Sequence, residues 1–423
     1  MHNAAISVDL GSAYTKVGIR RGFDTSATLA SATSISLDDE ENYLIPSVVA
    51  RVETRGTKRW LIGSHASAQK PGDGVTFFPY WKASLFAEGG AISRTDAAHI
   101  AEVFFRELLS ALLERIPHVR QLPVRIAIPA FNPSGTEDAM IKEIVQRAGW
   151  RSVATRTTVS EPEANAIGLW SRGRNSTWTP PRQSHRGPPN RSIRMQDMLE
   201  AGLRSAFRTM KDKHRILVTD VGAFTTDFGY VEFDSGFRDD DWNRPRTIQK
   251  SVELGIRQLD DRVRQLLPSN ITTHFASRPV IEWERAKRQL YHGNSHRMVI
   301  NGQKVDLGAG TAGENIQSEI FRFAESVLEA RVQFCKEHGL GPIDEEAVTG
   351  GGSAIPALRQ HLVSYATSTR HRVLDLWDPR EPEHAVANGA GPMTPREKDA
   401  RRFVNHQLVR CASALGAASV FFG

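Results

Sequence analysis

The chain has 423 residues, of which 54 are Lys or Arg, 48 are Asp or Glu, and 40% are hydrophobic. This length allows two to four domains, and the composition excludes a wholly disordered chain. No apolar run approaches the roughly 20 residues that span a bilayer, and the first residues do not resemble a secretory signal. The two cysteines cannot form a disulfide framework. We therefore expect a soluble, cytoplasmic protein without a membrane segment.

The net charge of +6 is concentrated in one segment of the chain. Residues 172–213 contain eight Arg and two Lys against three acidic residues, which gives +7, so the remaining residues sum to −1. Residues 171–194 hold four Pro and no acidic residue, which predicts an irregular exposed loop. Trp178 is its one aromatic residue, whereas single-stranded nucleic acids bind where aromatic and basic residues alternate. A solvated linker is therefore favoured over a nucleic-acid site.

Hydrophobic runs predict a mixture of strands and helices along the chain. Residues 4–10 and 14–20 predict a strand pair, and residues 44–63 predict a second pair around a polar turn. Residues 96–116 carry apolar residues at helical spacing, with Asp96 as the expected N-cap. The later predicted elements are a strand at 124–130, helices at 136–148, from 161 and at 195–210, strands at 215–222 and 228–233, and a strand, glycine turn and helix at 345–362. This mixture predicts an α/β fold.

Two of the predicted hairpins share one layout. In VDLGSAYTKVGI (8–19) and VTDVGAFTTDFGYV (218–231), an Asp closes a hydrophobic strand, and Gly and hydroxyl residues follow it. Tight turns of this kind can direct backbone N–H groups at phosphate oxygens. The carboxylates of Asp9 and Asp220 beside them suit a hydrated Mg²⁺. Either hairpin alone also fits an ordinary β-turn, but the repeat indicates two related halves.

A third motif, AVTGGGSAIPALRQ (347–360), predicts a glycine-rich turn between a strand and a helix. In this order, the three motifs resemble those of the actin, sugar-kinase and heat-shock ATPase superfamily. The stretch AIPAFNPSGTEDAMIKEIVQRAGW (127–150), followed by VSEPEANAIG (159–168), is similar to the DnaK-type heat-shock protein 70 family. Three further similar stretches are LIPSVVA (44–50), IEWERAKRQL (281–290) and PEHAVANGAG (382–391). The resemblance covers most of residues 5–392.

The resemblance implies an actin-like ATPase fold, with two lobes of duplicated ribonuclease-H-like domains and smaller peripheral subdomains. Lobe I would comprise residues 1–214, with a peripheral subdomain at about 41–121 and the basic insertion at 171–213. Lobe II would comprise residues 215–395, with a peripheral subdomain at about 263–314. A C-terminal helix and apolar tail would follow at 396–423.

The resemblance also implies a nucleotide site between the lobes. Asp9 and Asp220 would hold Mg²⁺ through its waters, and Glu161 together with Lys82 would orient the attacking water. The residues implied to be catalytic are Asp9, Lys82, Glu161, Asp220 and Thr225. The residues implied to bind the nucleotide are Gly11, Ser12, Ala13, Tyr14, Gly222, Ala223, Phe224, Asp227, Glu284, Lys287, Gly350, Gly351 and Gly352.

Several residues depart from the family pattern. Ala223 and Phe224 replace two glycines of the second phosphate-binding turn, which is expected to narrow the pocket or slow hydrolysis. Ala354 stands where the family has an Arg that packs on the base, and Tyr291 replaces a small hydroxyl residue. Only about thirty residues follow PEHAVANGAG at 382–391, fewer than a peptide-binding domain needs. Direct chaperoning of unfolded proteins is therefore not expected.

The function expected from the sequence is that of a chaperone-like, ATP-binding and slowly ATP-hydrolysing protein, with ATP or ADP and Mg²⁺ as its cofactors. It would act as a nucleotide-gated switch toward a protein partner, which would dock on the 171–213 insertion or on the C-terminal tail. Three alternatives stay open: an actin-like filament-forming ATPase, a small-molecule kinase of the same superfamily, and a scaffold without catalytic activity.

Overall fold

The computed structural model describes most of the chain. The described residues are 4–20, 27–30, 43–72, 74–78, 80–86, 92–130, 136–152, 156–174, 213–234, 245–278, 280–369, 372–374, 414–415 and 417. Four predicted features fall largely or wholly outside these residues: the basic insertion beyond residue 174, the helix at 195–210, the stretch 382–391 and most of the segment 396–423.

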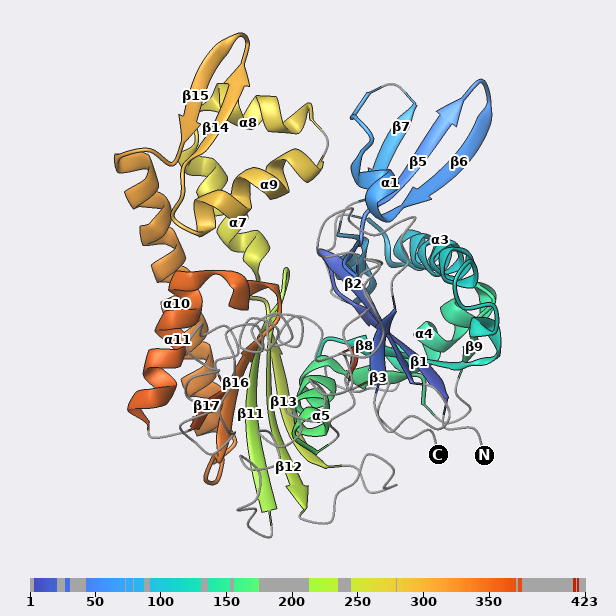
Figure 1. Ribbon diagram of the computed structural model, residues 1–423, viewed down its shortest axis with the longest axis vertical. Coiled ribbons are helices and arrows are strands. Elements are labelled where there is room, and N and C mark those ends of the chain that lie inside the picture. The colour runs from blue at the N-terminus through green and yellow to red at the C-terminus, as the bar shows by residue number, and fades with distance from the viewer. Residues whose placement is uncertain are drawn as a thin grey trace, which may run out of the picture.

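The first half of the chain, up to residue 174, builds a seven-stranded sheet (Figure 1). Its central strand β1 (Ala5–Leu10) pairs antiparallel with β2 (Tyr14–Arg20) and parallel with β8 (Pro123–Ile128). All residues of β1 are buried, as expected for a strand covered on both faces. The other strands are β3 (Ala27–Ala30), β4 (Ile45–Pro46), β9 (Arg151–Ser152) and β10 (Thr158–Ser160).

The second half, residues 213–374, builds a five-stranded sheet with the same pattern. The strands are β11 (Lys213–Val221), β12 (Thr226–Asp234), β13 (Arg246–Val252), β16 (Glu345–Thr349) and β17 (Arg372–Leu374). The path β13–β12–β11–β16–β17 corresponds to the path β3–β2–β1–β8–β10 of the first sheet. Each path has two antiparallel pairings followed by two parallel ones. The two predicted hairpins are therefore confirmed, and they occupy equivalent positions in the two sheets.

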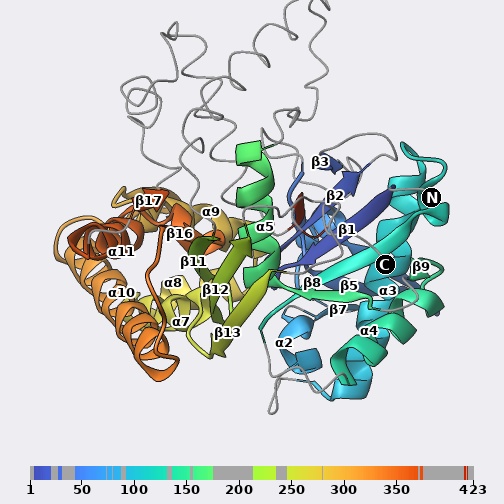
Figure 2. The same cartoon turned by 90° about the horizontal axis from the view of Figure 1, so that it is seen from below.

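One helix, α5 (Glu161–Arg174), stands between the two sheets (Figure 2). It contacts β8 and β10 on one side and β11 and β12 on the other. The close approach depends on Gly229 of β12, because a Cβ atom there would lie 2.3 Å from Cβ of Pro162. The helices on the outer faces are α3 (Arg94–Leu113), α4 (Thr136–Arg147), α10 (Thr311–Glu337) and α11 (Pro356–Ser368).

The N-cap of α3 is not the residue expected from the sequence. Ser93 is the N-cap, and its hydroxyl oxygen accepts a hydrogen bond from the backbone N–H of Asp96 at 3.0 Å. The prediction of Asp96 as the cap was wrong, because the apolar periodicity on which it was based begins one turn inside the helix. Asp96 instead lies in the first turn, where its negative charge interacts favourably with the positive end of the helix dipole.

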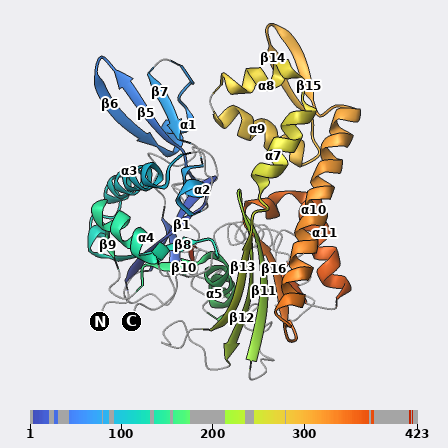
Figure 3. The same ribbon diagram turned by 180° about the vertical axis from the view of Figure 1, so that it is seen from behind.

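Each half also carries a smaller group of elements on the same side of the molecule (Figures 1 and 3). In the first half the group consists of β5 (Val49–Thr54), β6 (Thr57–Ile62), β7 (Val75–Phe78), α1 (Gly63–Ser67) and α2 (Trp81–Phe86). In the second half it consists of α7 (Ile256–Leu266), α8 (Ser269–Ala276), α9 (Val280–Tyr291), β14 (His296–Ile300) and β15 (Gln303–Leu307). Within the described ranges, no helix is long and apolar enough to cross a membrane.

Residues near the C-terminus pack on the first half. The hydroxyl of Ser7 donates a hydrogen bond to the backbone carbonyl of Ala414, and a Cβ atom at Gly18 would lie 2.4 Å from the same oxygen. Ala417 is fully buried in a cluster that includes Ala127 and Ala164. The first sheet is thus completed by residues that follow the whole second half in the sequence.

Candidate functional site

A cavity of about 210 Å³ lies between the two halves and receives side chains from both. The turns after β1 and β11 form one end of it. The helices α7 and α9 and the turn η2 (Gly351–Ala354) form the other end. The structure brings the residues predicted from the sequence together here: all of them line the cavity except Asp227 and Gly352, which lie directly behind its wall.

The turn between β1 and β2 is fixed by Ser47, which the sequence analysis did not identify. The Ser47 hydroxyl donates a hydrogen bond to the carbonyl of Gly11 at 2.5 Å, and its backbone N–H donates to the carbonyl of Ala13 at 2.9 Å. Gly11 has no room for a side chain, because a Cβ atom would lie 2.2 Å from the Tyr14 carbonyl oxygen. The turn is therefore preorganised without a ligand.

The turn between β11 and β12 is held by the N-terminus of α7. The backbone N–H groups of Ile256 and Arg257 donate to the carbonyls of Gly222 and Ala223 at 3.0 and 2.8 Å. These bonds satisfy two of the N–H groups that a helix start leaves unpaired, and they direct the two carbonyls toward α7. Ala223 and Phe224 thus lie in an ordered turn.

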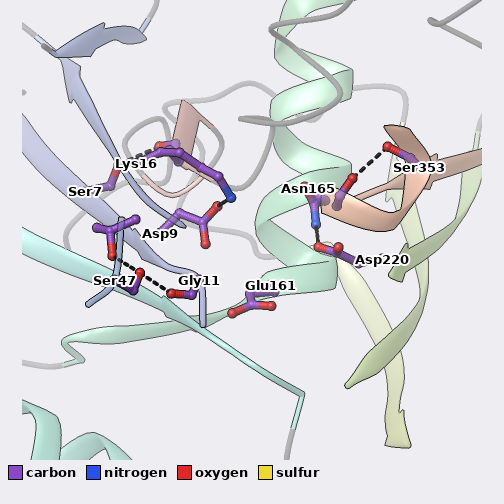
Figure 4. Close-up of polar contacts among 12 residues, drawn as sticks. Ser7, Asp9, Gly11, Lys16, Ser47, Glu161, Asn165, Asp220 and Ser353 are labelled. Atoms are coloured by element: carbon purple, nitrogen blue, oxygen red, sulfur yellow. Dashed lines mark hydrogen bonds and ion pairs between the residues drawn. The ribbon is translucent and has the colours of Figure 1, made fainter. Parts of the chain in front are cut away.

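Four buried carboxylates gather at this end of the cavity, those of Asp9, Glu161, Asp220 and Asp227, and lysines contact two of them. Figure 4 shows Asp9, Glu161 and Asp220 together with Lys16. Lys16 Nζ lies 2.8 Å from Asp9 Oδ2, and Lys82 Nζ lies 2.7 Å from Glu161 Oε1. The Lys82–Glu161 pair joins residues 79 positions apart. The predicted active-site lysine therefore lies beside the predicted catalytic glutamate.

The other two carboxylates have neutral hydrogen-bond donors. The side-chain amide of Asn165 donates to Asp220 Oδ2 (Figure 4). Asp227 accepts from the backbone N–H of Ala130 at 2.8 Å and from the Thr225 hydroxyl at 2.9 Å. Asn165 follows Glu161 by four residues and therefore shares its helix face, which is a signal that the sequence contained.

Burial raises the pKa of three of these carboxyl groups. The pKa of Glu161 rises to about 8, mainly through burial and also through the nearby aspartates, while Lys82 opposes the rise. The pKa of Asp220 rises to about 7 because of burial and of the charges of Asp227 and Asp9. Burial also raises the pKa of Asp227. The site therefore opposes the full ionisation of its own carboxylates.

The charges at this end suit a hydrated divalent cation. Four carboxylates face two ammonium groups, which leaves a formal excess of two negative charges. Among the described residues, no three His, Cys, Asp or Glu side chains form a compact group that could hold a metal ion directly. Mg²⁺ keeps most of its waters and needs only one or two protein carboxylates, so this donor set fits it.

The opposite end of the cavity contains a second buried polar cluster. Lys287 Nζ lies 2.8 Å from Glu284 and 3.1 Å from Asp260, and the Tyr291 hydroxyl donates to Asp260 at 2.5 Å. Burial alone would lower the pKa of Lys287, but Glu284 and Asp260 raise it. The sequence analysis predicted Glu284 and Lys287 for this end and missed Asp260.

The glycine turn after β16 connects the two ends. Gly350 has a φ of 82°, and a Cβ atom there would lie 2.1 Å from Asp220 Oδ1. Gly351, Ala354 and Ile355 follow it along the wall of the cavity.

Three further residues bridge the halves at the edge of the cavity. The rings of Tyr80 and Phe224 lie edge to face at 5.3 Å, and the Arg257 guanidinium lies 4.9 and 5.0 Å from them. Phe224 of the second turn thus directs its ring toward the other half. Neither Tyr80 nor Arg257 belongs to a local motif, so the sequence held no signal for them.

The chain was compared with protein-family models and with the curated proteins. No protein-family model matches it, and no curated protein is similar to it in sequence.

Proposed function

We propose that the chain is an ATP-binding, slowly ATP-hydrolysing protein of the actin-like ATPase fold, related to the heat-shock protein 70 family. It would act as a nucleotide-gated switch toward a protein partner. The observation that supports the proposal is the cavity between two halves whose sheets have the same strand order. The turns after β1 and β11, four carboxylates and two lysines meet at this cavity.

The proposed chemistry is attack of water on the γ-phosphate, promoted by positioning and by charge. Asp9 and Asp220 would hold Mg²⁺ through its waters, and the ion would supply positive charge beside the phosphate oxygens. Glu161 would act as the general base, and its contact with Lys82 fixes its orientation. The amides of both turns would contact the phosphates, and the Thr225 hydroxyl, which donates to Asp227, would fix the second turn.

The switch follows from the walls of the cavity. Both halves contribute side chains to the lining of the cavity, so a ligand that contacts both halves favours the closed arrangement. A partner that binds one arrangement better than the other would then respond to the nucleotide.

Calorimetric titration with ATP, ADP and a non-hydrolysable analogue, with and without Mg²⁺, tests the proposal. We expect Mg²⁺-dependent binding in the micromolar range or tighter, and a loss of hydrolysis of about 100-fold in the Asp9→Asn, Asp220→Asn double variant. The matched control is Asp306→Asn, which removes a carboxylate paired with Arg297 at the surface. Hydrolysis that persists in the double variant would contradict the proposed roles.

A nucleotide-binding scaffold without catalysis is the second candidate. Two observations favour it: the ammonium group of Lys16 already contacts Asp9, and Phe224 replaces a glycine beside the expected γ-phosphate position. The two candidates differ in a single-turnover experiment, because bound ATP would remain intact only in the scaffold.

A further inference from the structure

We propose that this cavity does not discriminate between purine bases, so that ATP and GTP bind with similar affinity and the triphosphate carries the specificity. The inference rests on the proposed function, because it assumes that a nucleotide binds with its phosphates at the carboxylate end. It concerns the opposite end, where α7, α9 and η2 would surround the base.

The polar side chains at that end bind one another. Asp260 is buried, and its two carboxylate oxygens accept from different donors: Oδ1 from the Tyr291 hydroxyl at 2.5 Å, and Oδ2 from Lys287 at 3.1 Å. A hydroxyl that donates to a buried carboxylate is not available to donate to a base. Tyr291 therefore contributes its ring surface to the cavity, and its hydroxyl occupies Oδ1 of Asp260.

The remaining charged groups contact features that all nucleotides share. Lys287 pairs with Glu284 at 2.8 Å, and such a pair suits the hydroxyl groups of a ribose. Arg288 lies 5.9 Å from the centre of the Tyr14 ring and donates to its hydroxyl at 3.3 Å. A guanidinium plane stacks on any base, because every base has a π-face.

Among the residues that the structure describes, Gly351, Ala354 and Ile355 line the cavity beside these groups, and none of the three has a hydrogen-bonding side chain. His292 lies exposed at the rim, with Nδ1 2.7 Å from the carbonyl of Arg288. A base at this end would thus be held by packing and stacking.

Packing discriminates poorly between bases of equal size. An apolar pocket separates similar ligands by about 10–200-fold when their volumes differ, whereas a site with dedicated hydrogen-bonding groups separates them by about 10⁴-fold or more. Adenine and guanine differ mainly in the hydrogen-bonding groups of their edges. We therefore expect dissociation constants for ATP and GTP within about tenfold of each other.

Calorimetric titration of the full chain with Mg²⁺-ATP and with Mg²⁺-GTP tests the inference. Similar affinities support it. A preference of more than about 100-fold for either nucleotide overturns it and leaves the proposed nucleotide site intact. If neither nucleotide binds at millimolar concentration, both the proposed function and this inference are wrong.

The variant Tyr291→Phe tests the assigned residue. It removes the donor from Asp260 Oδ1 and exposes a carboxylate oxygen to the two adjacent N–H donors of guanine, so we expect GTP to gain about tenfold over ATP. Tyr230→Phe is the matched control, because the Tyr230 hydroxyl donates to Pro342 outside the cavity. An unchanged ratio in a folded Tyr291→Phe protein would overturn the role of Tyr291, while the wild-type titration remains an independent test.

Discussion

At the scale of single residues, Gly350 occupies a position where a side chain would displace Asp220. Its φ of 82° disfavours any L-residue, and a Cβ atom would meet the Asp220 carboxylate at 2.1 Å. We expect Gly350→Ala to weaken Mg²⁺-dependent nucleotide binding at least tenfold and to lower the free energy of unfolding by about 1–2 kcal/mol. Calorimetry and denaturant unfolding measure the two effects.

Gly339→Ala separates backbone strain from steric displacement at the site. Gly339 has a φ of 53°, but no atom lies within 4 Å of a Cβ built there. This variant should lose a similar amount of stability and keep its nucleotide affinity. Equal losses of affinity in both variants would contradict the steric explanation.

The raised pKa values of Asp220 and Glu161 predict a pH-dependent stability of the unliganded protein. Their carboxyl groups ionise near pH 3.8 and 4.5 when unfolded, and at about 7 and 8 when folded. Between these values the folded state binds more protons, so the free energy of unfolding falls as the pH rises, by about 1.4 kcal/mol per pH unit for each proton. Denaturant unfolding from pH 5 to 8 measures this slope.

Asp220→Asn should reduce the slope, because an amide does not titrate, and Asp306→Asn should leave it unchanged. Added Mg²⁺ should also reduce it, since a cation favours the ionised carboxylates. Stability that rises with pH over this range would contradict the assigned pKa shifts.

The site residues divide by the kind of signal that could reveal them. Asp9 and Asp220 could be predicted because each stands next to its own turn in the sequence. Lys16 is opposite Asp9 in the hairpin register, so a register prediction would have found it. Ser47 and Asp260 reach the site only through the packing of distant elements, which a local pattern does not encode.

At the scale of elements, the second half depends on an ion pair between α10 and β16. Arg331 Nε and Nη2 lie 2.9 and 2.6 Å from the two carboxylate oxygens of Glu346, and both side chains are buried. We expect Arg331→Met to cost about 3–5 kcal/mol, because it removes the guanidinium that contacts both oxygens of the buried Glu346 carboxylate. Chemical denaturation measures the loss.

Two variants make this prediction specific. Arg322→Met removes an exposed partner of Glu319 on the same helix and should cost less than about 1 kcal/mol. Combining Arg331→Met with Glu346→Leu should recover part of the loss, because it also removes the buried carboxylate that has lost its guanidinium. A double variant less stable than the single one would argue against a cost from the isolated charge.

Several elements of the two sheets were predicted from the sequence, but no helix or strand was predicted between residues 234 and 344, where the structure has β13, α7, α8, α9, β14, β15 and α10. Periodicity located the hairpins at 4–20 and 215–233, because buried strands and tight turns are local patterns. The sheet order was not predictable from periodicity, since β1 pairs with β8, more than 110 residues later. The cap of α3 was misassigned because Ser93 precedes the periodic stretch.

At the scale of the whole molecule, the Tyr80–Phe224–Arg257 contact joins the halves beside the cavity. If it restrains opening, its loss should speed the release of product and raise kcat severalfold, because opening limits many such enzymes. Phe224→Gly and Tyr80→Ala break the contact from opposite halves and should act in the same direction. Phe321→Ala, at an exposed position of α10, is the control. A change in only one of the two variants, measured by steady-state hydrolysis, would contradict a bridging role.

Because Ala414 and Ala417 dock on the first sheet, the order in which the two halves are synthesised differs from the order in which their packing can be completed. About 240 residues lie between the end of α5 and Ala414. At roughly 5–20 residues per second, a ribosome needs about 10–50 s to add them. During this time the surface around Ser7 and Gly18 lacks its partner, while all strands of the second sheet have already been made. The half that is synthesised first is therefore the one that is completed last.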